Sequence, residues 1–121
     1  MLKILTVDDS RMMRQMLKVT LSSAGHDVYQ AGDGVEALEL LDEIGPLNAI
    51  ITDINMPRMD GFGFMMRTRE LPLYRATPIL VLSTESSDEK KSRARSMGAT
   101  GWIVKPFNAE TLLNAVRRVA G

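Results

Sequence analysis

The sequence predicts an α/β fold, a doubly wound parallel sheet of five strands with five helices around it. Apolar runs typical of strands alternate five times with segments of helical periodicity, which is the pattern of repeated strand and helix units. Three of these apolar runs stop at charged residues, at Asp8-Asp9, at Asp53 and at Lys105. Strands buried on both faces end in this way at the carboxyl edge of a parallel sheet, where ligands bind. With 121 residues the chain is long enough to bury a core, and we expect a single domain over residues 1–121.

The strands are expected where runs of Val, Ile and Leu are bounded by polar or turn residues. In the first and third runs, Ile4-Leu5-Thr6-Val7 and Ala49-Ile50-Ile51-Thr52, almost every residue is apolar, as in a strand covered on both faces. The expected strands are residues 3–7, 27–31, 48–53, 78–83 and 101–104.

Four helices are expected from apolar residues at helical spacing. The first begins at Ser10, a suitable N-cap, and ends at Gly25. The second covers 34–44, the third 61–71 and the fifth 108–119, behind Asn108. The inward residues are expected to be Met13, Met16, Leu17, Thr20, Leu21 and Ala24 in the first helix, Val35, Leu38 and Leu41 in the second, and Leu112, Leu113, Val116 and Val119 in the fifth.

The fourth helix, expected over 86–97, differs from the others. Its sequence is strongly charged, and Ala94 and Met97 are its only apolar anchors. Packing should therefore hold it weakly, so that its position can shift at low cost. A run of charges also occurs on any solvated face, and the functional interpretation depends on the helix lying beside the acidic edge.

The amino-acid composition argues against several classes of protein and of binding site. Lys plus Arg and Asp plus Glu both count 15, so no excess of positive charge is available for a nucleic-acid backbone. Cysteine is absent, which excludes disulfides and thiolate metal sites. Neither a signal-peptide pattern nor an apolar run of about 20 residues is present, and we expect a cytoplasmic monomer without membrane contact. Nine methionines lie mainly on expected helices, where filling gaps in the core is favoured over forming an adaptable partner surface.

The acidic residues predict a metal and phosphoryl site. Asp8 alone could simply favour the start of a helix, but two adjacent carboxylates beside Asp53 on the neighbouring strand call for a cation, and oxygen ligands suit Mg²⁺. A carboxylate such as Asp53 can act as the nucleophile toward a phosphoryl group. Lys105 would supply a second positive charge and the Ser83 hydroxyl a hydrogen bond, although a serine at a strand end is often only a turn residue.

Two turns support this site. Lys105 precedes Pro106, and a peptide bond before proline can be cis. Asp60-Gly61 provides turn residues near Asp53, although its simpler interpretation is an ordinary loop.

Together these motifs resemble the receiver domain of two-component response regulators, and the resemblance covers the chain from end to end. The motifs are Asp8-Asp9, Asp53 with Met56-Pro57 and Asp60-Gly61, Ser83-Thr84, and Lys105-Pro106-Phe107. The resemblance implies the flavodoxin-like fold, Asp53 as phosphoacceptor and Mg²⁺ as cofactor. The Mg²⁺ ligands that it implies are Asp8, Asp9, Asp53 and the main-chain carbonyl of Asn55. The residues that it implies for phosphate contact and switching are Ser83, Thr84, Lys105 and Trp102.

Trp102 stands where most members of the family have Tyr or Phe, three residues before the lysine. Asn55 lies two residues after Asp53, and Glu85 lies two residues after Ser83. This pair is similar to the one in CheY-like single-domain receivers of chemotaxis, and the resemblance implies that the two residues tune dephosphorylation. It further implies a CheA-like histidine kinase as phosphohistidine donor and a downstream target such as a flagellar motor switch protein. Such a protein is a switch that dephosphorylates itself, not a turnover enzyme.

Other functions fit the residues less well. A nucleotide triphosphatase needs a Gly-rich loop that ends in Gly-Lys, which the chain lacks. An aspartate-based phosphatase of the haloacid dehalogenase type needs a second Asp where this chain has Asn55. In a flavodoxin-like cofactor binder, the acidic edge would repel the phosphate of FMN unless a metal intervened. Within the receiver class, a motor-binding messenger, a phosphate sink and a relay intermediate all remain open.

Overall fold

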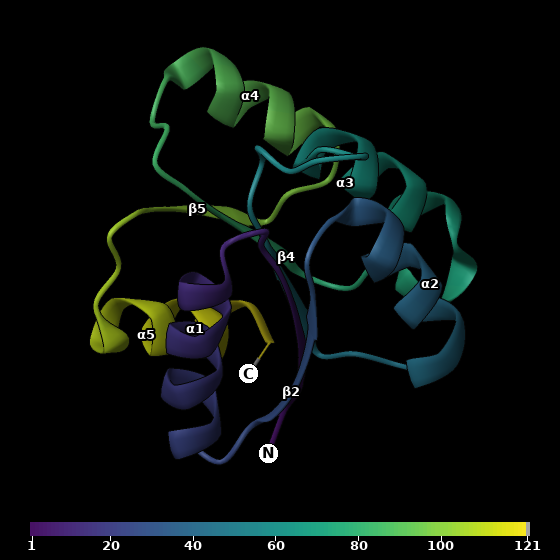
Figure 1. Ribbon diagram of the computed structural model, residues 1–121. Helices are drawn as coiled ribbons and strands as arrows, with labels where there is room; N and C mark the ends of the chain where they lie inside the picture. Colours follow the sequence, from purple (N-terminus) through teal and green to yellow (C-terminus); the bar gives the residue numbers. More distant parts are fainter. Residues whose placement is uncertain (121) are drawn as a thin grey trace.

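The computed structural model describes residues 1–120, which form one five-stranded parallel sheet between two layers of helices (Figure 1). The strands are β1 (Lys3–Val7), β2 (Asp27–Ala31), β3 (Ala49–Thr52), β4 (Ile79–Ser83) and β5 (Gly101–Val104). The helices are α1 (Arg11–Ser23), α2 (Gly34–Ile44), α3 (Gly61–Glu70), the short 3-10 helix η1 (Pro72–Tyr74), α4 (Asp88–Ser96) and α5 (Ala109–Ala120).

The strand order β2-β1-β3-β4-β5 gives the sheet a point at which the winding reverses. From β1 the chain passes to β2 on one side, and it then returns to place β3 on the other side of β1. Doubly wound sheets bind ligands at the carboxyl ends of the two strands that flank such a point. The ends of β1 and β3 are therefore the expected location of a site.

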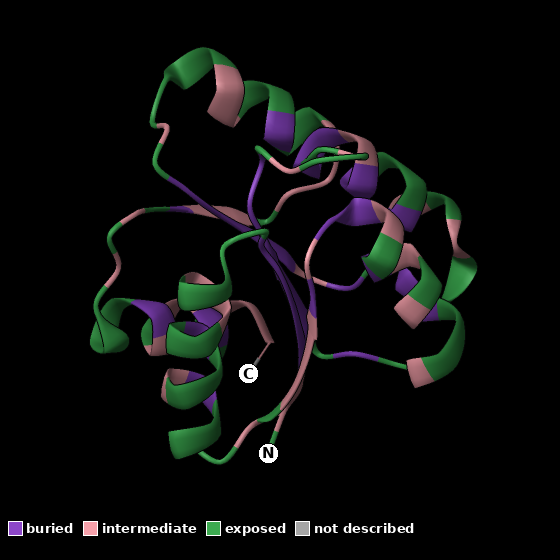
Figure 2. Ribbon diagram, in the orientation of Figure 1, coloured by how far each residue is buried: buried purple, intermediate pink, exposed green. Residues whose placement is uncertain are grey.

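The two faces of the sheet bury two separate cores. Neighbouring strand residues alternate between them: Ile4 packs with α1 and α5, whereas Leu5 packs with α2 and α3. Figure 1 shows α1 and α5 on one side of the sheet and α2, α3 and α4 on the other, and Figure 2 shows the central strands as almost continuously buried. The apolar runs are continuous because both faces of each strand are covered.

Side-chain caps fix where the helices begin. Ser10 accepts a hydrogen bond from the Met13 N–H at the start of α1, as predicted, and Asp33 and Asp60 cap α2 and α3. Ser87 caps α4, because its side chain accepts from the Lys90 N–H, and α4 therefore starts at Asp88 instead of residue 86. Such side-chain bonds satisfy N–H groups that have no partner within the helix.

The predicted fold class and all ten predicted strands and helices are confirmed, with end shifts of at most two residues. Of the expected inward residues, Leu17, Leu21, Leu41, Leu112 and Val116 are buried. Two positions are wrong, because Met16 is 44% exposed and Ala24 lies on the surface. The helix η1 was not predicted. Within residues 1–120, no helix has the length and apolar character needed to cross a membrane.

The prediction that methionines mainly fill the core is confirmed for five of the nine: Met65 lies within one core, and Met13, Met56, Met59 and Met97 are partly buried against the two cores. Among the methionines of the described chain, Met65 alone is fully buried. Met12 is 75% exposed and Met66 52% exposed. Helical spacing places a methionine on a face, but only the packing of the neighbouring helices decides whether that face is covered.

Candidate functional site

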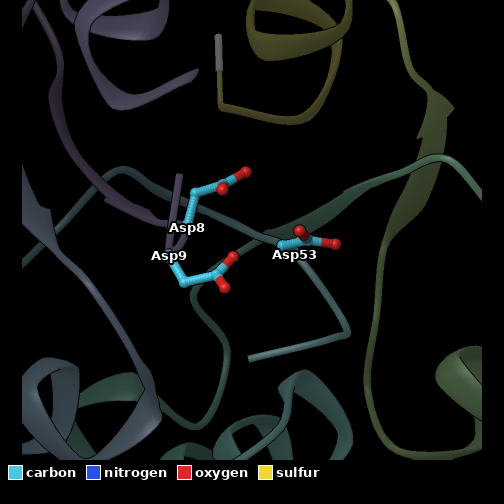
Figure 3. Close-up of side chains that lie close together, drawn as sticks. All are labelled: Asp8, Asp9 and Asp53. Atoms are coloured by element: carbon cyan, nitrogen blue, oxygen red, sulfur yellow. The ribbon is translucent and has the colours of Figure 1, made fainter. Parts of the chain in front are cut away.

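Three carboxylates converge at the point where the winding of the sheet reverses. Asp8 and Asp9 follow β1, Asp53 follows β3, and each offers an oxygen within 4.8 Å of the others. Figure 3 shows the three side chains lying side by side beyond the strand ends. Asp8 and Asp53 are buried and Asp9 is exposed, so the cluster opens to solvent on the side of Asp9.

Lys105 joins this cluster from the end of β5. Its Nζ donates to Asp8 Oδ2 at 2.8 Å and to Asp53 Oδ2 at 3.0 Å, and its side chain is only 11% exposed. The Lys105–Pro106 peptide bond is cis, as the sequence allows. One ammonium thus lies between two carboxylates that would otherwise repel each other.

The remaining carboxylate oxygens are held by the main chain. Asp8 Oδ1 accepts from the Ser10 N–H at 2.9 Å, and Asp53 Oδ1 accepts from the Ile54 N–H at 2.7 Å. The Arg14 guanidinium donates to the main-chain carbonyl of Asp8 at 2.6 Å and so anchors the turn that carries the acidic pair. Both buried carboxylates are therefore oriented before any ligand binds.

Burial and charge act in opposite directions on the site. Burial raises the pKa of Asp53 above its usual value, although the hydrogen bond from Lys105 partly offsets the shift. For Lys105, burial alone would lower the pKa, but the hydrogen bonds and charges of Asp8 and Asp53 outweigh burial and raise it. The amine is therefore firmly protonated, while ionised Asp53 is held at a cost in free energy.

The loop between β3 and α3 packs tightly against Asp53. A side chain at Gly61 would place its Cβ 2.2 Å from the Asp53 carbonyl oxygen, so only glycine fits there. At the tip of the loop, Arg58 adopts a left-handed conformation with φ of 65°. Its guanidinium binds both carboxylate oxygens of Asp33, at 2.9 and 3.2 Å. The loop is thereby tied to the N-terminus of α2.

The end of β4 brings Ser83 beside Lys105. The Lys105 N–H donates to the Ser83 carbonyl at 2.8 Å, and the buried Ser83 hydroxyl accepts from the Glu85 N–H at 3.2 Å. Its own hydroxyl proton is available to another acceptor. Trp102 donates its indole N–H to the Glu85 carbonyl at 2.9 Å.

Trp102 is half-buried and has free space on two sides. It lines a cavity of about 60 Å³ toward α4, together with Ala94 and Lys91. It also lines a groove of about 250 Å³ toward α5, together with Ala115 and Val119. The ring is therefore anchored at its N–H without being locked by packing.

The structure brings together four of the residues expected from sequence, Asp8, Asp9, Asp53 and Lys105. Ser83 and Trp102 follow on β4 and β5, whereas Asn55 and Thr84 are exposed on the turns after β3 and β4. Sequence reasoning missed Arg14, the pair formed by Arg58 and Asp33, and the ion pair between Lys90 and Glu85. Asp33 before an apolar helical pattern was a recognisable cap signal, but no sequence signal indicates the partner of Arg58.

The donor set fits a small divalent cation. Three carboxylates and one ammonium leave a formal charge of −2, from −3 and +1, at an edge open to solvent. Oxygen ligands of this kind suit Mg²⁺. Within residues 1–120, Asp9 has no hydrogen-bond or ion-pair partner, so its carboxylate is free to act as a ligand.

Comparisons with known proteins agree with this geometry. Residues 4–117 match the response regulator receiver domain family. A chemotaxis protein CheY homolog of Campylobacter jejuni is 38% identical, and the match covers 99% of this chain and 93% of that protein. The structure of chemotaxis protein CheY4 of Vibrio cholerae is similar with a TM-score of 0.95, at 50% identity and over 98% of both chains.

A third similarity concerns the fold alone. The receiver domain of sensor histidine kinase PA1611 from Pseudomonas aeruginosa has a TM-score of 0.91, at 24% identity, over 99% of this chain and 98% of that one. That structure was solved with a magnesium ion coordinated in the active site cleft.

Proposed function

Because the chain belongs to the response regulator receiver domain family, we propose that Asp53 accepts a phosphoryl group from the phosphohistidine of a histidine kinase. A receiver of this kind is a phosphorylation-activated switch of a two-component system, and its CheY relatives act in chemotaxis. The observation that supports Asp53 is its place at the end of β3, where Lys105 bridges it to Asp8.

In the transfer, a carboxylate oxygen of Asp53 forms a bond to phosphorus while the bond from phosphorus to the imidazole nitrogen of the donor breaks. The electron pair of that bond stays with the imidazole, which leaves as neutral histidine once its nitrogen is protonated. The Asp53 oxygen that binds the Ile54 N–H is held in place, whereas the oxygen that binds Lys105 can exchange this contact. The ammonium of Lys105 then stabilises the phosphoryl oxygens.

The residues that would hold Mg²⁺ are Asp8, Asp9, Asp53 and the main-chain carbonyl of Asn55. When bound, the ion neutralises charge on the transferring phosphoryl group. Support comes from the carboxylate oxygens within 4.8 Å of one another and from the formal negative charge that Lys105 leaves uncompensated.

Output follows from the groups around Ser83. The Ser83 hydroxyl donates a hydrogen bond to a phosphoryl oxygen on Asp53 and moves toward it. Glu85 moves with Ser83, because its N–H donates to the same hydroxyl. Trp102, bonded to the Glu85 carbonyl and flanked by two hollows, has room to change position. The surface of α4, β5 and α5 then changes its affinity for a downstream partner, for which a flagellar motor switch protein is our first candidate. Asn55 and Glu85, beside the site, set the rate at which the protein dephosphorylates itself.

The phosphoacceptor is tested by incubating the protein with acetyl phosphate and following it on a phosphate-affinity gel. The wild type should become labelled only when Mg²⁺ is present. Asp53→Asn should not be labelled. Equal labelling of Asp53→Asn and the wild type would contradict the assignment.

A further inference from the structure

Glu85 is held by three different neighbours at the end of β4. Its N–H donates to the Ser83 hydroxyl at 3.2 Å, and its carbonyl accepts the Trp102 indole N–H at 2.9 Å. Its carboxylate forms an ion pair with Lys90 in the first turn of α4. One residue thus contacts the expected switch hydroxyl, strand β5 and helix α4.

Lys90 is an unusual residue for its position. The first turn of a helix favours acidic side chains, because the N-terminal end of the helix dipole is positive. Asp88 and Glu89 follow this rule, but Lys90, whose N–H binds the N-cap Ser87, places a positive charge there. The Glu85 carboxylate compensates this charge. The ion pair therefore explains why a lysine is tolerated at this place.

The Glu85 carboxylate has little freedom to leave Lys90. Its Oε2 atom is inaccessible to solvent and has no hydrogen-bond partner within residues 1–120, so Oε1 and its contact with Lys90 provide the carboxylate's only bond there. The Glu85 side chain is 30% exposed and that of Lys90 41% exposed, so the pair is partly shielded from water, and its loss would leave the carboxylate without a hydrogen bond from the described chain. A movement of Glu85 should therefore take Lys90 along instead of breaking the pair.

The rest of α4 is attached at its other end. Ala94 is its one buried residue. Arg93 stacks on the Phe62 ring at 4.0 Å from the centroid, and Arg69 of α3 donates to the Gly98 carbonyl at 2.6 Å. At its N-terminal end, α4 is linked through Lys90 to Glu85, which lies two residues beyond β4.

We infer that Lys90 is a positioning residue that transmits displacement of Glu85 to α4, separately from the route through Trp102 to β5. This inference rests on the proposed function, because phosphorylation of Asp53 is what displaces Ser83 and Glu85. The carboxylate of Glu85 acts on α4, and its main-chain carbonyl acts on β5. Removing the charge of Lys90 should interrupt the first route and leave the second intact.

The test compares amide NMR spectra of wild type, Lys90→Gln and Lys91→Gln, each with Mg²⁺ and with or without beryllofluoride. Lys91 is the matched control, because it neighbours Lys90 on α4 but forms no ion pair in the described chain; since it also lines the cavity beside Trp102, it shows how much the loss of a nearby charge alone changes the indole shift. Beryllofluoride should shift the amides of residues 91–97 and the Trp102 indole in the wild type and in Lys91→Gln. In Lys90→Gln the shifts of residues 91–97 should fall to less than half, and the indole shift should persist.

A second variant approaches the pair from the other side. Glu85→Gln keeps both main-chain bonds and should give the same loss in α4, and the double variant Glu85→Gln with Lys90→Gln should lose no more than either single variant. Two outcomes in Lys90→Gln would overturn the inference of separate routes. One is that beryllofluoride shifts the amides of residues 91–97 as much as in the wild type, and the other is that the Trp102 indole shift is lost together with them. Absence of every shift in the wild type would instead contradict the proposed function.

Discussion

At the scale of single residues, Lys105 determines the charge state of the acidic site. It contacts Asp8 and Asp53 and is only 11% exposed, so both ion pairs lie largely out of water. Because burial raises the pKa of Asp53, its ionised form destabilises the fold at neutral pH, and Lys105 limits this cost. The site is thus built for accepting a charged ligand and not for stability.

Neutralising Asp53 should therefore not destabilise the protein without metal. An acid with a raised pKa in the folded state contributes less stability as pH rises above its value in the unfolded chain. In EDTA at pH 7, Asp53→Asn is expected to melt at or above the temperature of the wild type. Calorimetry tests this, with the exposed Asp27→Asn as a control that should change little. A clear drop for Asp53→Asn alone would show that its carboxylate is structural.

Removing Lys105 should have the opposite effect and should depend on pH. Lys105→Met leaves Asp8 and Asp53 as unpaired carboxylates, at a cost of roughly 3 kcal/mol at pH 7. The pKa of Asp53, which burial already raises, should rise further without Lys105, so the variant should approach wild-type stability as pH falls and Asp53 becomes protonated. Urea unfolding at several pH values measures this difference. A loss of stability that does not vary with pH would indicate a packing defect.

The positions of site residues were predictable where the sequence places charges at strand ends, as for Asp8, Asp53 and Lys105. Partners that meet only in the folded chain were not predictable. Arg58 and Asp33 are 25 residues apart, and their contact depends on the path of the loop after β3. The ion pair of Lys90 with Glu85 could have been suspected, because a lysine in the first turn opposes the helix dipole.

At the scale of elements, the helices differ in how firmly they are attached. α5 buries Leu112 and Val116, whereas α4 buries Ala94 alone, as its charged sequence predicted. α2 is fixed at both ends: Asp33 caps its start, and the Tyr74 hydroxyl donates to the Leu41 carbonyl at 3.0 Å near its end. Because α4 has one buried residue, it is the helix that we expect to shift most easily when Asp53 is phosphorylated.

The cap of α2 can be separated from its ion pair. Asp33→Ala removes both the bond to the Glu36 N–H and the contact with Arg58, and should cost about 1 to 2 kcal/mol. Asp33→Asn keeps the cap, and should cost less than about 1 kcal/mol because Arg58 is 57% exposed.

The contribution of the Asp33 carboxylate to the stability of the fold should depend on pH. The hydrogen bond from Arg58 lowers the pKa of Asp33 below 3.8. Its contribution to stability is therefore present above that pH and is lost as pH falls through the lowered value. Equal losses for Asp33→Ala and Asp33→Asn in chemical denaturation would mean that the charge, and not the cap, stabilises α2.

Element positions were predictable from periodicity, but ends and exposure were not. The start of α4 depends on which of two adjacent serines becomes the cap, and only Ser87 has its hydroxyl in reach of the Lys90 N–H. The exposure of Met16 depends on how closely the start of α5 lies beside α1, which the sequence of α1 cannot show.

At the scale of the whole molecule, two cores share one sheet, and the reversal in its winding determines where the site lies. β1 and β3 supply the carboxylates, β4 the serine, and β5 the lysine and tryptophan. Under the proposed function, a change at Asp53 would reach β4 first and then β5. The order of the strands follows the direction in which we expect the signal to travel.

The lone tryptophan allows this transmission to be measured. Ser83→Ala should still bind Mg²⁺ and become phosphorylated, but should lose most of the phosphate-dependent change in Trp102 fluorescence. The reason is that the alanine cannot donate to a phosphoryl oxygen or accept from the Glu85 N–H. Asp53→Asn, which should lose the beryllofluoride response altogether, controls for quenching by the metal. A wild-type response in Ser83→Ala would mean that another route links Asp53 to β5.

The position of β5 at the side of the sheet also affects how the molecule behaves toward other sheets. It pairs with β4 on one side only and contains four residues, Gly101–Val104. Pro106, which lacks an N–H, follows two residues later. A short edge with few unpaired main-chain groups is a poor template for strand addition and aggregation. The strand that we propose takes part in signalling can therefore lie at the edge of the sheet without favouring the addition of a strand from a second chain.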